Sequence, residues 1–206
     1  AEVLKYCEEA EAKLEKLSNR AYYLGELRQS ERALLERAGR LAGVLSRERK
    51  AAAVRLSEEM QRELADLNMR GTSFEVSFSV CLDPNGVPYF VEGGDEESGA
   101  REMVGFDLTG IDPDEFLISP NPGEEARPLA RIASGGEMAR LMLALKTILC
   151  KADAIPTLVF DEIDVGVGAR SGTKVGEKLW RLTENHQVLC ITHLPQIAAA
   201  ADTHLS

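Results

Sequence analysis

The sequence predicts an α/β domain joined to a long helical arm, and two patterns of apolar residues predict it. Residues 1–70 contain no proline and repeat leucine, alanine and methionine at alternating steps of three and four, which is typical of a long helix with one apolar seam. In the last third of the chain, two helical stretches (136–152 and 170–184) alternate with two short apolar strands (157–160 and 188–192). Such an alternation is typical of parallel strands covered on both faces by helices.

The arm is predicted to pair with another helix. A helix of this length would extend roughly 100 Å at 1.5 Å per residue, too far to bury its seam on one small domain. We therefore expect an antiparallel coiled coil, with an ordinary helical bundle as the alternative. A kink or loop is expected near Gly25, Gly39 and Gly43, and Gly71 is expected to end the helix. The seam residues are Leu14, Leu17, Ala21, Leu24, Leu34, Ala38, Leu41, Leu45, Leu56, Met60, Leu64 and Leu67.

A second region, residues 71–130, has the pattern of short strands and turns. Residues 74–80 alternate apolar and polar side chains, and a turn at 83–86 is expected to return the chain as a hairpin through 87–91. Residues 92–101 form a glycine- and acid-rich loop, and a further strand is expected at 103–108. We place the domain boundary at the end of the arm, with 1–70 as the returning arm helix and 71–206 as the domain.

Composition excludes some classes of function. With 44% hydrophobic and 28% charged residues, and no apolar run near the roughly 18 residues of a membrane span, the chain is expected to be cytoplasmic and to have no membrane partner. Its four cysteines lack metal or redox spacing and are expected to be free thiols. The net charge of −10 comes from residues 71–130, which hold two basic and 13 acidic side chains. This is more typical of a solvated acidic face than of a binding site, and no basic stripe marks a nucleic-acid interface.

The first candidate site is Ser134-Gly135-Gly136-Glu137, directly before a predicted helix. Ser134 and Glu137 have the spacing of a capping box, which any helix can carry. Two glycines in a first turn cost helix stability by about 1 kcal/mol each relative to alanine, so they indicate that something approaches the backbone closely. The bare N–H groups of a helix start bind anions, and phosphate is the obvious candidate.

The second candidate site follows the apolar strand 157–160, where Asp161 and Glu162 stand next to each other and Asp164 extends a polar loop. Open α/β sheets bind ligands at this carboxyl edge. One acid can hold Mg²⁺ and the next can orient or deprotonate a water. The alternative is a strand that merely ends in a polar turn.

The third candidate is His193, which follows the second apolar strand. A lone histidine is more often structural, but a right-handed crossover would bring Asp161, Glu162 and His193 to one sheet edge. His186 and His204 lie outside this geometry and are expected at the surface. The sequence contains no G-x-x-x-x-G-K-[ST] phosphate loop, and the stretch 166–174 has the wrong spacing to serve as one.

The order of these motifs resembles the ATP-binding-cassette superfamily. Ser134–Glu137 is similar to its signature motif, Leu158–Glu162 to its Walker B, Asp164 to its D-loop, and His193 to its switch histidine. The arm narrows the resemblance to chromosome-maintenance ATPases. Within these, residues 119–124, 132–137, 161–168 and 192–197 resemble the RecN family of bacterial DNA repair proteins.

The resemblance implies the C-terminal lobe of a P-loop ATPase head that uses ATP and Mg²⁺. It implies that Asp161 assists Mg²⁺, that Glu162 is the general base on the hydrolytic water, and that His193 contacts the γ-phosphate. The Walker A motif would belong to an N-terminal lobe of the same protein, so this segment alone is expected to be inactive.

The resemblance further implies a division of labour between two subunits. Ser134, Gly135 and Gly136, with Glu137 completing the motif, would bind ATP held by the other subunit, and Asp164 would couple the two sites. The implied function is double-strand-break repair and recombination by a cohesin-like homodimer that engages DNA and DNA ends at the nucleoid. Two alternatives remain open: another chromosome-maintenance ATPase, such as a nuclease-associated type with a zinc hook, and a coiled-coil scaffold that does not hydrolyse ATP.

Overall fold

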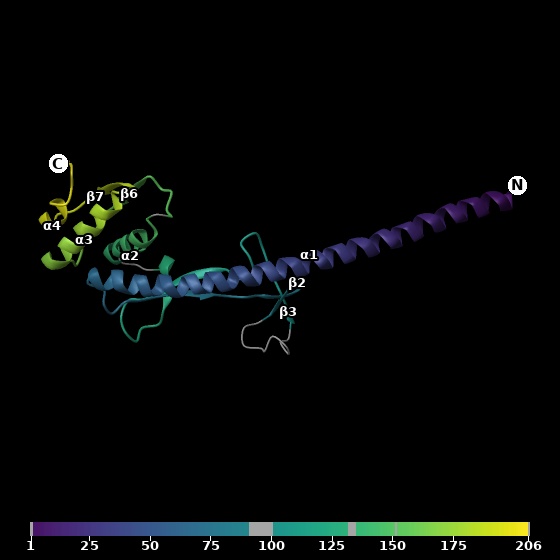
Figure 1. The fold of residues 1–206 in the computed structure, drawn as a ribbon, viewed down its shortest axis with the longest axis horizontal. Coiled ribbons are helices and arrows are strands. Elements are labelled where there is room, and N and C mark those ends of the chain that lie inside the picture. Colours follow the sequence, from purple (N-terminus) through teal and green to yellow (C-terminus); the bar gives the residue numbers. More distant parts are fainter. Residues whose placement is uncertain (1, 91–100, 132–134, 151, 206) are drawn as a thin grey trace. The chain divides into compact units, whose positions relative to one another are not determined.

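The computed structural model describes residues 2–90, 101–131, 135–150 and 152–205, which form two compact units. The arm unit consists of residues 1–48 and 79–113, and the core unit of residues 49–78 and 114–206. Helix α1 (Glu2–Asp66) contributes to both units, and Figure 1 labels the elements in chain order. Most of the loop expected at 92–101 lies outside the described residues. The predicted boundary at residue 70 stays a prediction.

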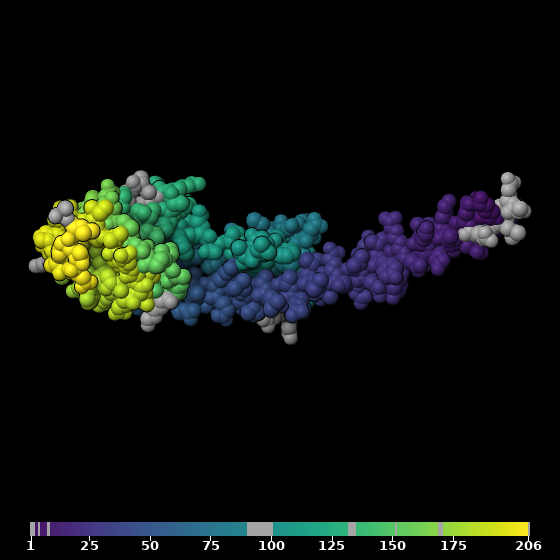
Figure 2. Space-filling model, turned by 90° about the horizontal axis from the view of Figure 1, so that it is seen from above, coloured from purple at the N-terminus to yellow at the C-terminus, as the bar shows by residue number. Residues whose placement is uncertain are grey.

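The long arm helix is confirmed, because α1 contains 65 residues. Every described side chain from residue 3 to residue 34 is exposed, and Figure 2 shows no other described segment over the purple start of the helix. The expected breaks at Gly25, Gly39 and Gly43 are wrong, since α1 continues through all three. The partner helix of the arm stays a prediction.

Close packing explains one of these glycines, Gly39. In the arm unit, β2 (Leu82–Phe90) pairs antiparallel with β3 (Arg101–Val104), and the hairpin packs on α1. A Cβ atom at Gly39 would collide with the carbonyl oxygen of Pro88, and one at Gly43 would lie 3.6 Å from the ring of Tyr89. Gly39 therefore lets the strand approach the helix backbone, whereas a Cβ atom at position 43 would make an ordinary van der Waals contact.

The predicted hairpin of residues 74–80 with 87–91 is wrong. Strand β1 (Ser73–Phe78) pairs antiparallel with β4 (Asp114–Ser119), which also pairs with β5 (Arg127–Pro128). Residues 83–86 do turn, but as a bulge within β2, where Leu82 and Val87 both pair with Val104. The strand expected at 103–108 ends early, at Val104.

The last turns of α1 belong to the core unit. Leu56 is partly buried there, and Met60, Leu64 and Leu67 are buried against strands and helices of the core, so this part of the seam has its partner within the chain. The helix ends at Asp66 rather than at Gly71. Asn68 has a left-handed backbone (φ 62°), a conformation that asparagine tolerates and that stops a helix.

The α/β prediction is confirmed in the rest of the core unit. After the short helix η1 (Leu129–Arg131), α2 (Gly135–Leu149) leads to β6 (Thr157–Phe160), α3 (Ala169–Leu182), β7 (Gln187–Cys190) and α4 (Pro195–Ala198). Strands β6 and β7 are parallel neighbours.

One face of the β6–β7 sheet is buried, and the other is not. Leu158 and Phe160 face the core, whereas Val159 is 64% exposed and Leu189 and Ile191 are exposed as well. The expectation that helices cover both faces is therefore wrong for the part of the chain that the structure describes. Apolar side chains on a bare sheet face indicate a surface that another element covers.

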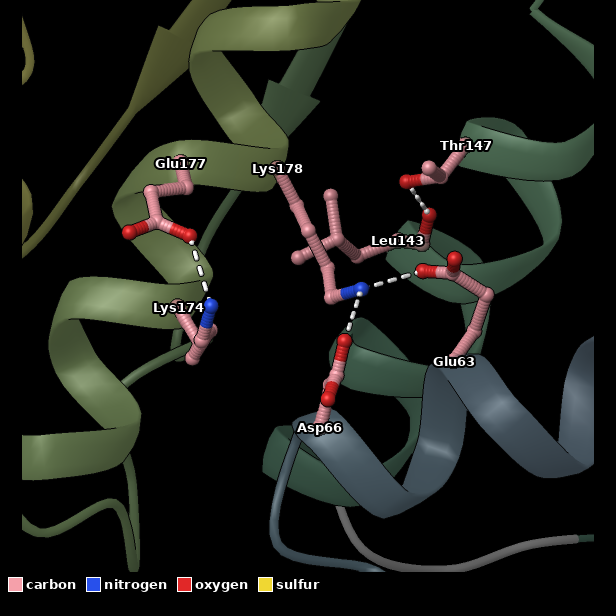
Figure 3. Close-up of polar contacts among 7 residues, drawn as sticks. All are labelled: Glu63, Asp66, Leu143, Thr147, Lys174, Glu177 and Lys178. Atoms are coloured by element: carbon pink, nitrogen blue, oxygen red, sulfur yellow. Dashed lines mark hydrogen bonds and ion pairs between the residues drawn. The ribbon is translucent and has the colours of Figure 1, made fainter.

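A buried lysine joins α3 to the end of α1 within the core unit. Figure 3 shows Lys178 extending from α3 toward Glu63 and Asp66 of α1, and its ammonium lies 3.1 Å from the Asp66 carboxylate. The Lys178 side chain is 4% exposed. Lys174, one turn earlier on α3, pairs instead with exposed Glu177 at 3.0 Å.

Three smaller expectations have different outcomes. The four cysteines are free thiols, as predicted. His204 is exposed, as predicted. The expectation for His186 is wrong: its side chain is buried, and its Nδ1–H donates a hydrogen bond of 2.6 Å to the carbonyl of Ile155. Among the described residues, no helix combines the length and apolarity that a bilayer crossing requires.

Candidate functional site

The loop after β6 carries the two adjacent acids. Asp161 and Glu162 are both exposed at the carboxyl end of the strand, and the Asp161 Oδ1 atom accepts a hydrogen bond of 2.9 Å from the backbone N–H of Glu162. Glu162 has a left-handed backbone (φ 57°), which is strained for a residue with a Cβ atom. Such strain concentrates at functional positions. The sequence signals found the acids but not this conformation.

The N-terminus of α2 lies against the same loop. A Cβ atom at Gly135 would collide with the carboxylate of Glu162, and one at Gly136 would lie 2.9 Å from the Cβ of Val165 and 3.2 Å from the carbonyl oxygen of Glu162. Packing within the chain therefore favours glycine at 136, where backbone and a β-branched side chain are close, whereas at 135 the exposed Glu162 side chain can move aside. Ser134 lies outside the described residues, and Glu137 is partly buried in the first turn of α2.

Arg140 joins α2 to this loop, and the sequence analysis missed it. Its side chain is buried, and its Nη1 atom donates a hydrogen bond of 2.6 Å to the carbonyl oxygen of Val165. Burial lowers the pKa of the Arg140 guanidinium, and the nearby Glu137 carboxylate partly opposes that shift. The sequence did contain one signal for Arg140: it follows Gly136 by four residues, which places both on the same face of the predicted helix.

The end of β7 meets the loop at Asp164. The backbone N–H of Ile191 donates a hydrogen bond of 2.9 Å to the carbonyl of Phe160, which aligns the carboxyl ends of the two strands. The Asp164 Oδ2 atom accepts hydrogen bonds from the Thr192 hydroxyl at 2.5 Å and from the His193 N–H at 2.8 Å, and it lies 3.0 Å from the His193 Nδ1 atom. The predicted convergence of Asp161 and Glu162 with His193 stays a prediction, and the side chain that contacts His193 is Asp164.

The electrostatics of Asp164 follow from these contacts. Burial alone would raise the pKa of its carboxyl group. The hydrogen bonds from Thr192 and His193, together with the charge of His193, outweigh burial and hold that pKa below its usual value. The carboxylate form is therefore the stable form at neutral pH. Thr192 was missed from the sequence, because a threonine before a histidine carries no distinctive spacing.

The carboxylate of Asp161 suits a partial site for Mg²⁺. An exposed aspartate at a strand end is a suitable single ligand for Mg²⁺, which binds proteins through one or two carboxylates plus phosphate oxygens and water. Among the described residues, no three acids, histidines or cysteines gather into a metal cluster. Asp161 therefore fits the role of a single carboxylate ligand of Mg²⁺.

The chain resembles RecN proteins over its whole length, although no family model matches it. It is 40% identical over 205 residues to the DNA repair protein RecN of Treponema pallidum, and the matched region covers 100% of this chain and 33% of that protein. It is 36% identical to RecN of Bacillus subtilis, over 99% of this chain and 34% of that protein. With RecN of Mycobacterium tuberculosis the identity is 39% over 98% of this chain.

Solved structures of Smc head domains are also similar. The head domain with an extended coiled coil from Pyrococcus furiosus is 21% identical, covers 75% of this chain and 31% of that chain, and has a TM-score of 0.44. The head domain from Thermotoga maritima is 22% identical over 72% of this chain and 41% of that chain, with a TM-score of 0.33. The chain spans about a third of the length of the curated relatives it matches. By sequence, the chain belongs to the RecN family.

Proposed function

We propose that this chain is part of an ATP-hydrolysing head in a DNA repair protein that acts on double-strand breaks. One observation carries the proposal: the loop after β6 brings Glu162, Asp164 and His193 to one edge of the sheet, beside the glycines of α2. The names of the relatives, DNA repair protein RecN, support repair as the process.

Each side chain has a chemical role in this proposal. Asp161 would hold Mg²⁺, and Glu162 would take the proton of the attacking water. His193 would donate a hydrogen bond to the γ-phosphate. Bound ATP would supply the phosphoryl group and Mg²⁺ would neutralise part of its charge, so the protein's own contribution is positioning and electrostatic stabilisation.

The bare face of the β6–β7 sheet supports a second lobe in the complete protein. Val159, Leu189 and Ile191 expose apolar surface there, which a Walker A lobe of the same protein would cover. In the proposed homodimer, Ser134, Gly135 and the rest of the signature would face ATP bound to the other subunit. Closure of the heads around ATP would then move the arms that engage double-stranded DNA.

A substitution of the proposed base tests hydrolysis. In a full-length RecN-family protein that contains this chain, Glu162→Gln should leave ATP binding intact and lower turnover by roughly 10²- to 10⁴-fold, the usual contribution of a general base. Glu184→Gln, an exposed acid after α3, is the matched control and should change neither.

Two outcomes would contradict the proposal. Unchanged turnover in Glu162→Gln would remove the base from its role. A full-length protein that binds ATP but does not hydrolyse it, with or without linear double-stranded DNA, would favour the non-hydrolysing scaffold. Linear and closed circular DNA in the same assay would separate a response to DNA ends from a response to duplex alone.

A further inference from the structure

Asp164 and His193 come from different loops but share one carboxylate oxygen. Asp164 lies in the loop after β6, and His193 follows β7. The Oδ2 atom of Asp164 accepts the Thr192 hydroxyl and the His193 N–H, and it contacts the His193 Nδ1 atom at 3.0 Å. The Thr192 hydroxyl oxygen in turn accepts the N–H of Leu194 at 3.1 Å. One carboxylate oxygen therefore accepts a hydrogen bond from the backbone of His193 and lies within ion-pair distance of its ring.

Exposure shows why the ring needs this contact. The His193 side chain is 76% exposed, so packing cannot select one of its rotamers, whereas the Asp164 side chain is 4% exposed and held by its own hydrogen bonds. The contact with the buried Asp164 carboxylate therefore limits the rotamers that the exposed His193 ring can adopt. It also engages Nδ1 and leaves Nε2 as the ring nitrogen that faces away from Asp164.

We propose that Asp164 is a positioning residue for His193 of its own chain, acting through the His193 backbone N–H and ring. The proposal rests on the proposed function of His193 at the γ-phosphate. It differs from the coupling across two subunits that the family resemblance implies for Asp164. The buried carboxylate faces Thr192 and His193 rather than solvent.

The first test measures the contact itself. Hydrogen exchange of the segment that contains His193 is compared in full-length wild-type protein, Asp164→Ala and Asp164→Asn, all without nucleotide. We expect the His193 N–H to exchange at least about tenfold faster in Asp164→Ala, because its acceptor is gone, and less so in Asp164→Asn, which keeps an acceptor oxygen. Asp153→Ala is the matched control, because Asp153 also accepts hydrogen bonds in the core unit but does so from Lys146 and Ile155. Unchanged exchange in Asp164→Ala would overturn the proposal.

The second test separates positioning from a merely structural role. Asp164→Ala should lower the kcat of ATP hydrolysis by roughly 10- to 100-fold, as a misplaced catalytic group does, with little change in KM. Combined with His193→Ala, it should cost no more than about twofold beyond His193→Ala alone. Independent, multiplying losses would show that Asp164 acts without His193 and would refute the positioning role.

The two tests keep this proposal distinct from the proposed function. If full-length wild-type protein hydrolyses no ATP, the proposed function fails, and the exchange experiment alone decides whether Asp164 holds His193. If hydrolysis is present and Asp164→Ala leaves both exchange and kcat unchanged, only the positioning role fails.

Discussion

Glu162 allows a sharp test of backbone strain at the proposed base. Its φ of 57° is left-handed, and a Cβ atom in that region costs roughly 1–2 kcal/mol. Glu162→Ala removes the carboxylate but keeps the Cβ, whereas Glu162→Gly removes both. The added freedom of glycine in the unfolded chain costs about 0.5–1 kcal/mol. We therefore expect Glu162→Gly to be the more stable of the two by about 0.5–1 kcal/mol, measured by urea unfolding.

The neighbouring position provides the control with the opposite sign. Asp161 is not among the residues with positive φ, so Asp161→Gly should be less stable than Asp161→Ala by about 0.5–1 kcal/mol. Each pair shares the same lost side-chain contacts, so only the backbone differs within it. If Glu162→Gly is no more stable than Glu162→Ala, or if both positions show the same order, Glu162 is not strained.

Acid titration of stability follows from Asp164. The folded-state pKa of Asp164 is depressed, so its contribution to the free energy of unfolding is full above the unfolded pKa of about 3.9 and is lost as the pH falls through the folded pKa. Urea unfolding between pH 3 and 7 should therefore show a smaller loss of stability below about pH 4 in Asp164→Asn than in wild type. Burial and the charges of Asp164 and Asp161 raise the pKa of the Cys190 thiol to about 11. At pH 8 its thiolate fraction is on the order of 0.001, so iodoacetamide followed by mass spectrometry should modify exposed Cys7 long before Cys190; equal rates would contradict this environment. Lys178→Met leaves two carboxylates of α1 without their cation and should lower the stability by about 2 kcal/mol in a thermal melt. Lys174→Met, which removes an exposed ion pair, should lower it by less than about 0.5 kcal/mol. Equal losses of stability would rule out a buried ion pair at Lys178.

Local patterns predicted the elements of the core unit better than their partners. The apolar run at 157–160 predicted β6, because a short buried strand needs no more than its own residues to be recognised. The same kind of pattern at 74–80 could not name β4 as its partner. That choice comes from packing, such as the contact of the Phe74 and Phe116 rings at 5.4 Å, between residues far apart in sequence.

The candidate site shows the same limit. Adjacent acids after an apolar strand predicted Asp161 and Glu162, and the crossover rule predicted that His193 lies at the same sheet edge. The contact that joins the loops runs through Asp164, and the acceptor for Arg140 is a backbone carbonyl. A carboxylate oxygen shared by two loops and a backbone carbonyl acceptor correspond to no particular spacing of residues, so a sequence pattern cannot predict either contact.

The loop 161–165 connects the glycines at the N-terminus of α2 with His193. Val165 at one end contacts Gly136 and accepts the hydrogen bond of Arg140, while Asp164 beside it holds His193. A ligand shifts such an element only if it binds one arrangement better than the other. The Cβ of Val165 and the carbonyl oxygen of Glu162 lie close to the backbone of Gly136, so a shift of the N-terminus of α2 would press on the loop. Movement of the loop would carry the Asp164 carboxylate, and with it the backbone N–H of His193, so the N-terminus of α2 and His193 are connected through one loop of the same chain.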